Sequence, residues 1–469
     1  MEEAKKLEAY SAYDKTKQKS KMKKILSILA FMALTMGVQA QTVDSTSSPT
    51  QEHEVESLED QIIECYNNND CWQMEQLCTN HADSIDVGVL AFARGYMALR
   101  FWQLEEAQKQ LELCVNEYAE KLDDDVLYSA VIKLCKCLSM LEEHDKAAKL
   151  TAKYIKYFSE FEDCTNEVER LKDEYERSQE FAKYPKMTVE KVSGDIAIPF
   201  HIDSIGATDE SAQMYIDGKI QGKSECMMFD TGCCQNFINN SLARELHLTP
   251  INVSMEGNAG GSFTGTYVMA DSVQFGGMTF RNVKFVLNSA GAEEDNQSKF
   301  RMIIGMPIIQ QMRQFTMDFE HQVITIPSNP KDYAVRNIAL DANEVGHIHI
   351  HITHNGKPVD MLVDTGNAVY SFLDYTFYNE HAEEVDTIKT KHQIILSGAA
   401  GKKIRLNAVL MRDFKFMLNG HEYSIPEVTV TKKKHDDITM LIHNNMGLRF
   451  MSSFKRVTIS LKDAHIEFE

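Results

Sequence analysis

The spacing of apolar residues changes once along the chain, near Met187. Between residues 58 and 184 apolar side chains recur at helical spacing, and no proline interrupts them until Pro185. Apolar residues three and four positions apart form one face of an amphipathic helix, so we predict helices throughout this region. Beyond Met187 apolar and polar residues alternate, as over residues 196–202 and 348–352, which is the spacing of half-buried strands. The predicted fold class is multidomain α+β, with an all-α region followed by an all-β unit.

The region from residue 58 to residue 184 also shows signs of an internal repeat. An apolar segment over residues 89–96 contains Gly95 and is followed by Ala107, and a second unit of this kind runs over residues 126–148. Small residues at such positions let paired helices approach closely, and the pattern resembles a tetratricopeptide repeat. We therefore predict a tetratricopeptide-like helical domain over residues 58–184. It serves either as a scaffold or as a groove for a protein partner or a substrate peptide.

The β-rich remainder contains the same ordered set of features twice. Each half has an apolar run, an Asp-Thr-Gly triplet, a glycine cluster, an apolar stretch with one glycine, and a final alternating strand. The triplets are Asp230, Thr231 and Gly232 in the first half and Asp364, Thr365 and Gly366 in the second. The cluster glycines include Gly260 and Gly261 in the first half and Gly398 and Gly401 in the second. This order indicates a duplicated module, predicted to span residues 187–331 and 338–469.

The duplicated aspartates define the candidate chemistry. Two carboxyl groups held a few ångströms apart cannot both ionise, so they share one proton. The ionised group can take a proton from water while the protonated group donates one to a carbonyl oxygen, which is the equipment for peptide hydrolysis. Asp-Thr-Gly after a strand is also ordinary turn chemistry, in which the aspartate is exposed. The apolar or mixed residues on both sides of each triplet favour a buried pair instead.

Residues 1–40 have the order of a targeting segment. Met22 begins a short basic region, residues 25–38 form an apolar core, and small or neutral residues lead up to Ala40. This order is typical of a secretory signal peptide, with Met22 as the expected true start and residues 41–57 as a linker. The apolar run is shorter than the roughly 20 residues that span a bilayer, so we expect no stable membrane insertion after cleavage. The predicted location is the bacterial periplasm or the medium outside the cell.

Charge and composition limit the classes of partner and cofactor that we expect. The net charge of -20 disfavours nucleic acid, whose phosphates require Lys and Arg. The ten cysteines lack the paired spacing of a zinc site, although the three within residues 65–78 are candidates for disulfides outside the cytosol. His347, His349 and His351 alternate with isoleucines, so we interpret them as the solvent-facing side of a strand rather than as a metal site. We expect a peptide or protein substrate, no metal and no cofactor.

Residues 187–469 resemble the retropepsin-like aspartic proteases, with two lobes fused in one chain as in the pepsin-like enzymes. The resemblance rests on ordered motifs at residues 229–232, 258–262 and 303–305 in the first lobe and at residues 363–366, 397–401 and 446–447 in the second. It implies a bilobal all-β unit in which Asp230 and Asp364 are catalytic and face each other. It also implies that the triplet threonines lock the two loops together, that the triplet glycines give the backbone room beside the carboxylates, and that the glycine clusters lie in flaps over the cleft.

Some positions depart from the pattern of this family. The residue after each triplet is Cys233 in the first lobe and Asn367 in the second, where serine or alanine is usual. Cysteine donates hydrogen bonds weakly and asparagine more strongly, so we expect the two carboxylates to differ in basicity. Asn445 and Met446 precede Gly447, where two apolar residues are expected. We therefore predict an exported aspartic endopeptidase, and we keep as the alternative a catalytically inactive bilobal peptide-binding protein with a helical-repeat interaction domain.

Overall fold

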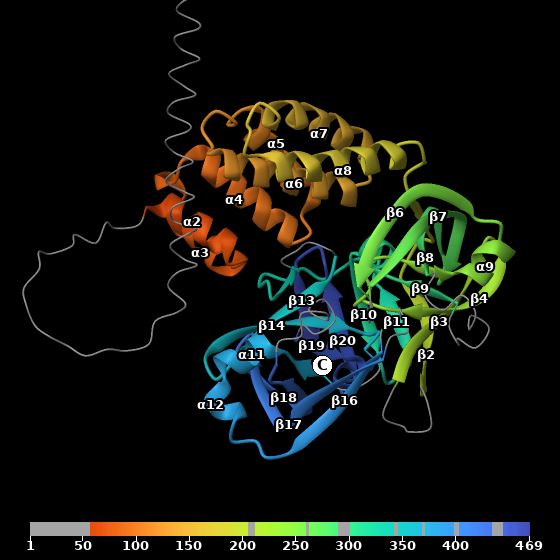
Figure 1. Cartoon of the computed structure of the whole chain (residues 1–469). Helices are drawn as coiled ribbons and strands as arrows, with labels where there is room; N and C mark the ends of the chain where they lie inside the picture. The colour runs from red at the N-terminus through yellow and green to blue at the C-terminus, as the bar shows by residue number, and fades with distance from the viewer. Residues whose placement is uncertain are drawn as a thin grey trace, which may run out of the picture. The chain divides into compact units, whose positions relative to one another are not determined.

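The described chain begins with helices and continues with strands, as the change in apolar spacing predicts (Figure 1). The computed structural model describes residues 57–204, 212–258, 262–288, 301–341, 346–367, 371–397, 403–433 and 444–469. The predicted signal peptide, most of the predicted linker and the predicted flap glycines Gly260, Gly261, Gly398 and Gly401 lie outside the described residues. The α+β class is confirmed as an α-helical region followed by a β-rich region.

Helices make up the N-terminal part of the described chain. They are α2 (Leu58–Asn67), α3 (Cys71–His81), α4 (Val87–Arg100), α5 (Leu104–Asn116), α6 (Asp124–Met140), α7 (His144–Phe158) and α8 (Thr165–Phe181), with the short 3-10 helix η1 (Ala82–Ser84) after α3. Ser57, Asp70 and Asp86 accept hydrogen bonds from first-turn N–H groups of α2, α3 and α4, which satisfies groups that a helix leaves unpaired. A Cβ added to Gly95 would lie 2.7 Å from Leu111 of α5, so α4 and α5 approach closely there. The tetratricopeptide-like interpretation stays a prediction.

The first β module comprises the elements from β1 to β11. Its strands are β1 (Thr188–Lys191), β2 (Ile196–Ser204), β3 (Ala212–Ile220), β4 (Lys223–Phe229), β5 (Phe237–Asn239), β6 (Thr249–Asn258), β7 (Ser262–Phe275), β8 (Met278–Asn288), β9 (Met302–Ile304), β10 (Gln314–Asp318) and β11 (Val323–Ile326). Short helical segments lie between them: α9 (Asn240–Glu245), α10 (Met306–Ile309) and η2 (Gln310–Met312).

The second β module comprises the elements from β12 to β21. Its strands are β12 (Ile338–Leu340), β13 (Ile348–His354), β14 (Lys357–Asp364), β15 (Phe372–Leu373), β16 (Lys391–Ser397), β17 (Lys403–Leu418), β18 (His421–Thr431), β19 (Asn445–Gly447), β20 (Arg456–Ser460) and β21 (His465–Phe468). Its short helices are α11 (Tyr375–Glu380), α12 (Ala382–Val385) and α13 (Leu448–Met451). In β13 the isoleucines are buried while His349 and His351 are only partly so.

The two modules repeat one scheme of strand pairing. In the first, β4 pairs in parallel with β9, while β5 pairs with β9 on one side and β8 on the other. In the second, β14 pairs in parallel with β19. There β15 pairs antiparallel with β19 and parallel with β18, as β5 does with β9 and β8. The hairpin of β6 and β7 likewise corresponds to that of β16 and β17. The sequence motifs that occur twice therefore occupy equivalent places in two equivalent arrangements.

The modules are joined by the pairing of one strand near the C-terminal end of each. β10 of the first module pairs antiparallel with β20 of the second, from Gln314 opposite Ser460 to Asp318 opposite Arg456. β20 continues into a hairpin with β21, so the C-terminal strands extend the sheet of the first module. This pairing therefore places strands of both modules in one sheet.

The helices contact both β modules through individual side chains. Arg100 of α4 donates to the Leu340 carbonyl at 2.6 Å, and the Phe181 ring of α8 packs edge-on against Tyr267 of β7 at 5.1 Å. Glu142, in the turn after α6, accepts from the Met187 backbone N–H at 2.7 Å and pairs with Lys284 of β8 at 2.8 Å. Among the residues described, none of the helices has the length and apolar character needed to span a bilayer.

Candidate active site

Each Asp-Thr-Gly triplet follows a buried strand. β4 leads into Asp230 and β14 ends at Asp364, and the residues just before each aspartate, such as Phe229 and Val363, are fully buried. A parallel neighbour holds each strand end: β9 pairs beside Phe229, and β19 pairs beside Asp364 itself. The Asp230 N–H also donates to the Ile304 carbonyl at 3.0 Å. Each aspartate thus lies at the C-terminal end of an apolar strand, which holds its carboxyl group in place.

The threonines connect the two triplets through reciprocal hydrogen bonds. The Thr231 hydroxyl donates to the Val363 carbonyl at 2.8 Å, and the Thr365 hydroxyl donates to the Phe229 carbonyl at 2.8 Å. Each hydroxyl also accepts from the backbone N–H of the other threonine at 3.0 Å. Both side chains are fully buried. The two loops are therefore held together by bonds that water does not reach.

The glycines bring each carboxyl group against the opposite loop. A Cβ added to Gly232 would collide with the carboxyl group of Asp364, and one added to Gly366 would collide with that of Asp230. A residue with any side chain cannot occupy either position without displacing an aspartate. The structure therefore brings Asp230 and Asp364 together, with the triplet threonines and glycines of both modules around them.

Burial and the neighbouring carboxyl group shape the acidity of Asp230. Burial raises the pKa of Asp230 well above its usual range, and the neighbouring carboxyl group of Asp364 raises it further. Backbone N–H groups of Gly232 and Gly366 oppose this shift, and the Gly232 N–H lies 2.9 Å from the near carboxylate oxygen of Asp230. A carboxyl group in this situation keeps its proton at a pH where an exposed aspartate has lost it.

Asp364 has an additional set of hydrogen-bond donors. The backbone N–H groups of Gly366 and Asn367 each lie 2.9 Å from its Oδ1. The side-chain amide of Asn445 donates to its Oδ2 at 2.8 Å, and the Asn367 side chain in turn donates to Asn445 Oδ1 at 2.7 Å. Sequence reasoning treated Asn445 as a departure from the family pattern and missed this contact. Aligning the two modules could have revealed this contact, because Asn445 on β19 occupies the position that Ile303 occupies on β9, two residues before the aspartate of the paired strand.

Two thiols follow the first aspartate. Burial raises the pKa of Cys233 above its usual range, and burial raises the pKa of Cys234 to about 11. Thiols of this kind stay protonated near neutral pH and are poor nucleophiles. All ten cysteines lie in the described part of the chain, and each is a free thiol there, so the disulfides considered from the sequence are not formed.

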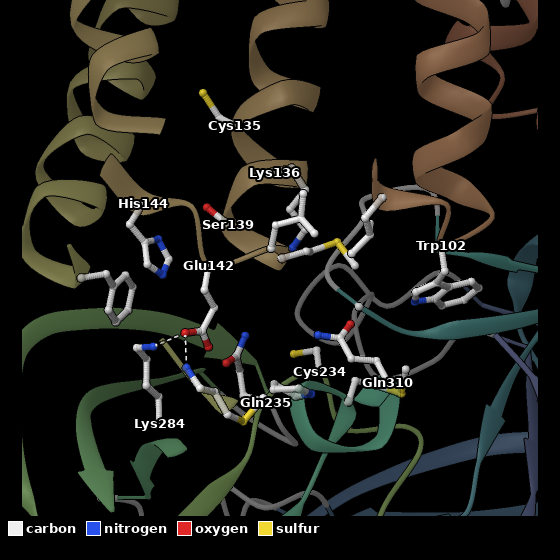
Figure 2. Close-up of a pocket in the computed structure, with 18 of the residues that line it drawn as sticks. Trp102, Cys135, Lys136, Ser139, Glu142, His144, Cys234, Gln235, Lys284 and Gln310 are labelled. Atoms are coloured by element: carbon white, nitrogen blue, oxygen red, sulfur yellow. Dashed lines mark hydrogen bonds and ion pairs between the residues drawn. The ribbon is translucent and has the colours of Figure 1, made fainter. Parts of the chain in front are cut away.

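A cavity of about 960 Å³ adjoins the loop that follows Asp230. Cys234 and Gln235 of this loop face it from the β side, while Lys136 and Ser139 of α6 face it from the helical side (Figure 2). The ion pair of Glu142 with Lys284 closes one part of its wall. A molecule in this cavity would lie next to the loop that follows Asp230 in the first β module.

The hairpins that carry the predicted flap glycines are long. β6 and β7 remain paired up to Asn258 opposite Ser262, and β16 and β17 up to Ser397 opposite Lys403. Gly260 and Gly261 fall in the connection between the first pair of strands, and Gly398 and Gly401 in the connection between the second. Their placement over Asp230 and Asp364 stays a prediction, because these connections lie outside the described residues.

One comparison with known families bears on this site. Residues 216–308 match the family model described as aspartyl protease. The matched segment runs from β3 to α10 and contains the first triplet, both thiols and β9. It supports an aspartyl protease-like domain in the first β module, and therefore a peptide or protein substrate. No curated protein matches the chain.

Proposed function

We propose that the protein is an exported aspartic endopeptidase that hydrolyses peptide bonds through a water molecule held between Asp230 and Asp364. The two β modules are then its lobes, and each contributes one aspartate. The observation that carries the proposal is reciprocal: each carboxyl group lies against the glycine of the opposite triplet. The aspartyl protease match over residues 216–308 supports the same activity for the first lobe.

The proposed chemistry needs only the shared proton of the pair. The ionised carboxylate removes a proton from water, the water oxygen attacks the peptide carbonyl carbon, and the protonated carboxyl group donates to the carbonyl oxygen. Collapse of the tetrahedral intermediate breaks the C–N bond: the carboxyl group that took the water proton gives it to the leaving nitrogen, and the other carboxylate takes back a hydroxyl proton as the carbonyl reforms. Substrate would bind as an extended strand beneath the predicted flaps, because exposed strand edges pair with extended peptides.

Peptide cleavage across a range of pH tests this function. We expect Asp230→Asn and Asp364→Asn each to lower kcat by about 10²- to 10⁴-fold, since each removes one of the two proton-transfer groups. Asp217→Asn is the matched control, because Asp217 is an exposed residue on β3 of the same lobe. Full activity in either dyad variant would contradict the shared-proton mechanism.

The alternative is a catalytically inactive peptide-binding protein with the same architecture. The additional donors around Asp364 favour it only if they hold the pair in an inactive protonation state. It predicts peptide binding without cleavage at any pH, and binding that the Asp230→Asn variant retains. Calorimetric titration of a peptide together with product analysis across pH would distinguish the two functions, because only the inactive protein binds peptide without forming products at any pH.

Export and the role of the helices complete the proposal. We expect the mature chain recovered from the periplasm or medium to begin at Gln41, which N-terminal sequencing would show. For the helices, we propose a protein partner or a substrate segment held by the domain at residues 58–184. Pull-down with this domain and with the intact chain would show whether the helices carry the binding.

A further inference from the structure

The strand beside each aspartate carries a different side chain at the equivalent position. In the first module Ile303 of β9 pairs opposite Met228, two residues before Asp230. In the second module Asn445 of β19 pairs opposite Leu362, two residues before Asp364. The positions are equivalent in register, yet one side chain is apolar and the other is an amide. Both are buried, with exposed fractions of 5% and 4%.

The orientation of the Asn445 amide is fixed by its neighbour. Its Oδ1 accepts from the Asn367 side chain at 2.7 Å, so its Nδ2 faces Asp364 Oδ2 at 2.8 Å. Asn367 also gives its backbone N–H to Oδ1 of the same carboxylate. Donors directed at both oxygens of a carboxyl group stabilise its ionised form, since only that form accepts at both.

The surroundings of Asp230 favour the opposite state. The side chain at the equivalent strand position is the hydrocarbon of Ile303, which donates nothing. Cys233 stands where the second module has Asn367, and a thiol is a weak donor. Burial without a side-chain donor disfavours a charged carboxylate. The pair therefore has one member placed to hold the charge and one placed to hold the proton.

We propose that Asn445, oriented by Asn367, is a positioning residue that keeps Asp364 ionised, so that the shared proton resides on Asp230. The inference rests on the proposed function for its consequence: Asp364 is the base that activates water, and Asp230 is the acid that donates to the substrate carbonyl. A purely structural asparagine would satisfy buried polar atoms without setting which carboxyl group carries the charge.

The pH profile of kcat/KM separates these two roles. Removing a donor to the ionised form makes the first ionisation of the pair harder. We therefore expect Asn445→Leu to move the acid limb to higher pH by about one unit. Asn367→Ala should move it the same way by less, because it loosens the Asn445 amide without removing it. Asn367→Ala also keeps the test valid if Asn445→Leu does not fold.

Met446→Leu is the control for disturbing β19. Met446 is a fully buried neighbour on the same strand and is not part of the hydrogen-bonded set. We expect its profile to overlay that of the wild type. An acid limb that stays in place in both asparagine variants would overturn the inference while leaving the proposed protease intact.

A second measurement needs no substrate. In protein labelled with ¹³C at aspartate carboxyl carbons, the two resonances can be assigned through the Asp230→Asn and Asp364→Asn variants. Between the two ionisations of the pair we expect the Asp364 resonance at its ionised position and the Asp230 resonance at its protonated position. The reverse assignment, or equal sharing, would overturn the inference. This outcome is independent of turnover, so it separates failure of the inference from failure of the proposed function.

Discussion

The two β modules use the same backbone arrangement to produce two different carboxyl groups. The triplets are related residue by residue: the threonine hydroxyls exchange matching bonds of 2.8 and 3.0 Å, and the glycines make matching close approaches. The neighbouring strands differ, since β9 offers Ile303 where β19 offers Asn445. Strand pairing therefore determines where the carboxyl groups lie, and one side chain on an adjacent strand distinguishes their chemistry.

The strongest challenge to the symmetric part of this comparison is a methyl group at either glycine. We expect Gly232→Ala and Gly366→Ala each to lower kcat/KM by at least about 100-fold, because the new Cβ displaces the opposite carboxyl group. The two losses should be similar, since the approaches are reciprocal. Gly420→Ala is the control for a strained backbone without a collision, because Gly420 has φ of +80°, which disfavours a side chain, but open space around it. Loss of activity at only one of the two triplet glycines would contradict the symmetry.

The threonine lock offers a second test of symmetry, with stability as the measured quantity. Thr231→Val and Thr365→Val keep the shape of the side chain but leave a buried N–H and a buried carbonyl without partners. We expect each to lower the free energy of unfolding by about 2–5 kcal/mol, measured by urea denaturation. The double variant should lose less than the sum, because each single change already breaks bonds shared with the other residue.

Thr458→Val is the matched control for the lock. Its hydroxyl is bonded to the Thr316 hydroxyl at 2.8 Å across β10 and β20, and neither residue belongs to a triplet. Its loss leaves no backbone group of the triplets unpaired, so we expect a smaller effect on stability. Strictly additive losses at Thr231 and Thr365 would show that the two hydroxyls act independently.

The difference between the two carboxyl groups should be reversed when the side chains beside them are exchanged between the modules. Ile303→Asn with Cys233→Asn gives the first module the pair of amides that the second has. Combined with Asn445→Ile and Asn367→Ala, the exchange should place the charge on Asp230 and the proton on Asp364. We expect carboxyl ¹³C resonances to exchange positions. Resonances that remain as in the wild type would show that burial, rather than the amides, sets the difference.

The sequence predicted the parts of this site that depend on local pattern. The change from helical to alternating spacing near Met187 located the boundary between helices and strands, and the repeated triplets identified the residues that the structure brings together. It did not predict the role of Asn445, whose partner Asp364 lies 81 residues away along the chain. That contact depends on the parallel register of β14 with β19, which local residue spacing does not specify.

The sequence pattern also did not predict the contacts of the helices with the β modules. Arg100 bonds to a carbonyl 240 positions away, and neither residue belongs to a recognisable motif. The same holds for the pairing of β10 with β20 that joins the modules. Such contacts follow from the three-dimensional arrangement of whole elements, so no short window of residues contains the information.

The smallest expected effect concerns the paired strands β10 and β20 that join the two modules, and it is measured as the dependence of the unfolding free energy on pH. Burial raises the pKa of Asp318 on β10, but hydrogen bonds from the His321 N–H and from Arg456 of β20 outweigh this and lower it to about 2. A depressed pKa gives stability that is present above the unfolded pKa near 3.9 and is lost as pH falls through about 2.

We expect Asp318→Asn to lower the unfolding free energy at neutral pH by roughly 1.5 kcal/mol and to flatten the dependence of this free energy on pH between pH 4 and about 2. Asp217→Asn, on an exposed site of the first module, should leave both unchanged. If Asp318→Asn keeps the wild-type slope in this range, the joint between the modules does not depend on this charge, and the acid sensitivity of the protein has to come from within one module.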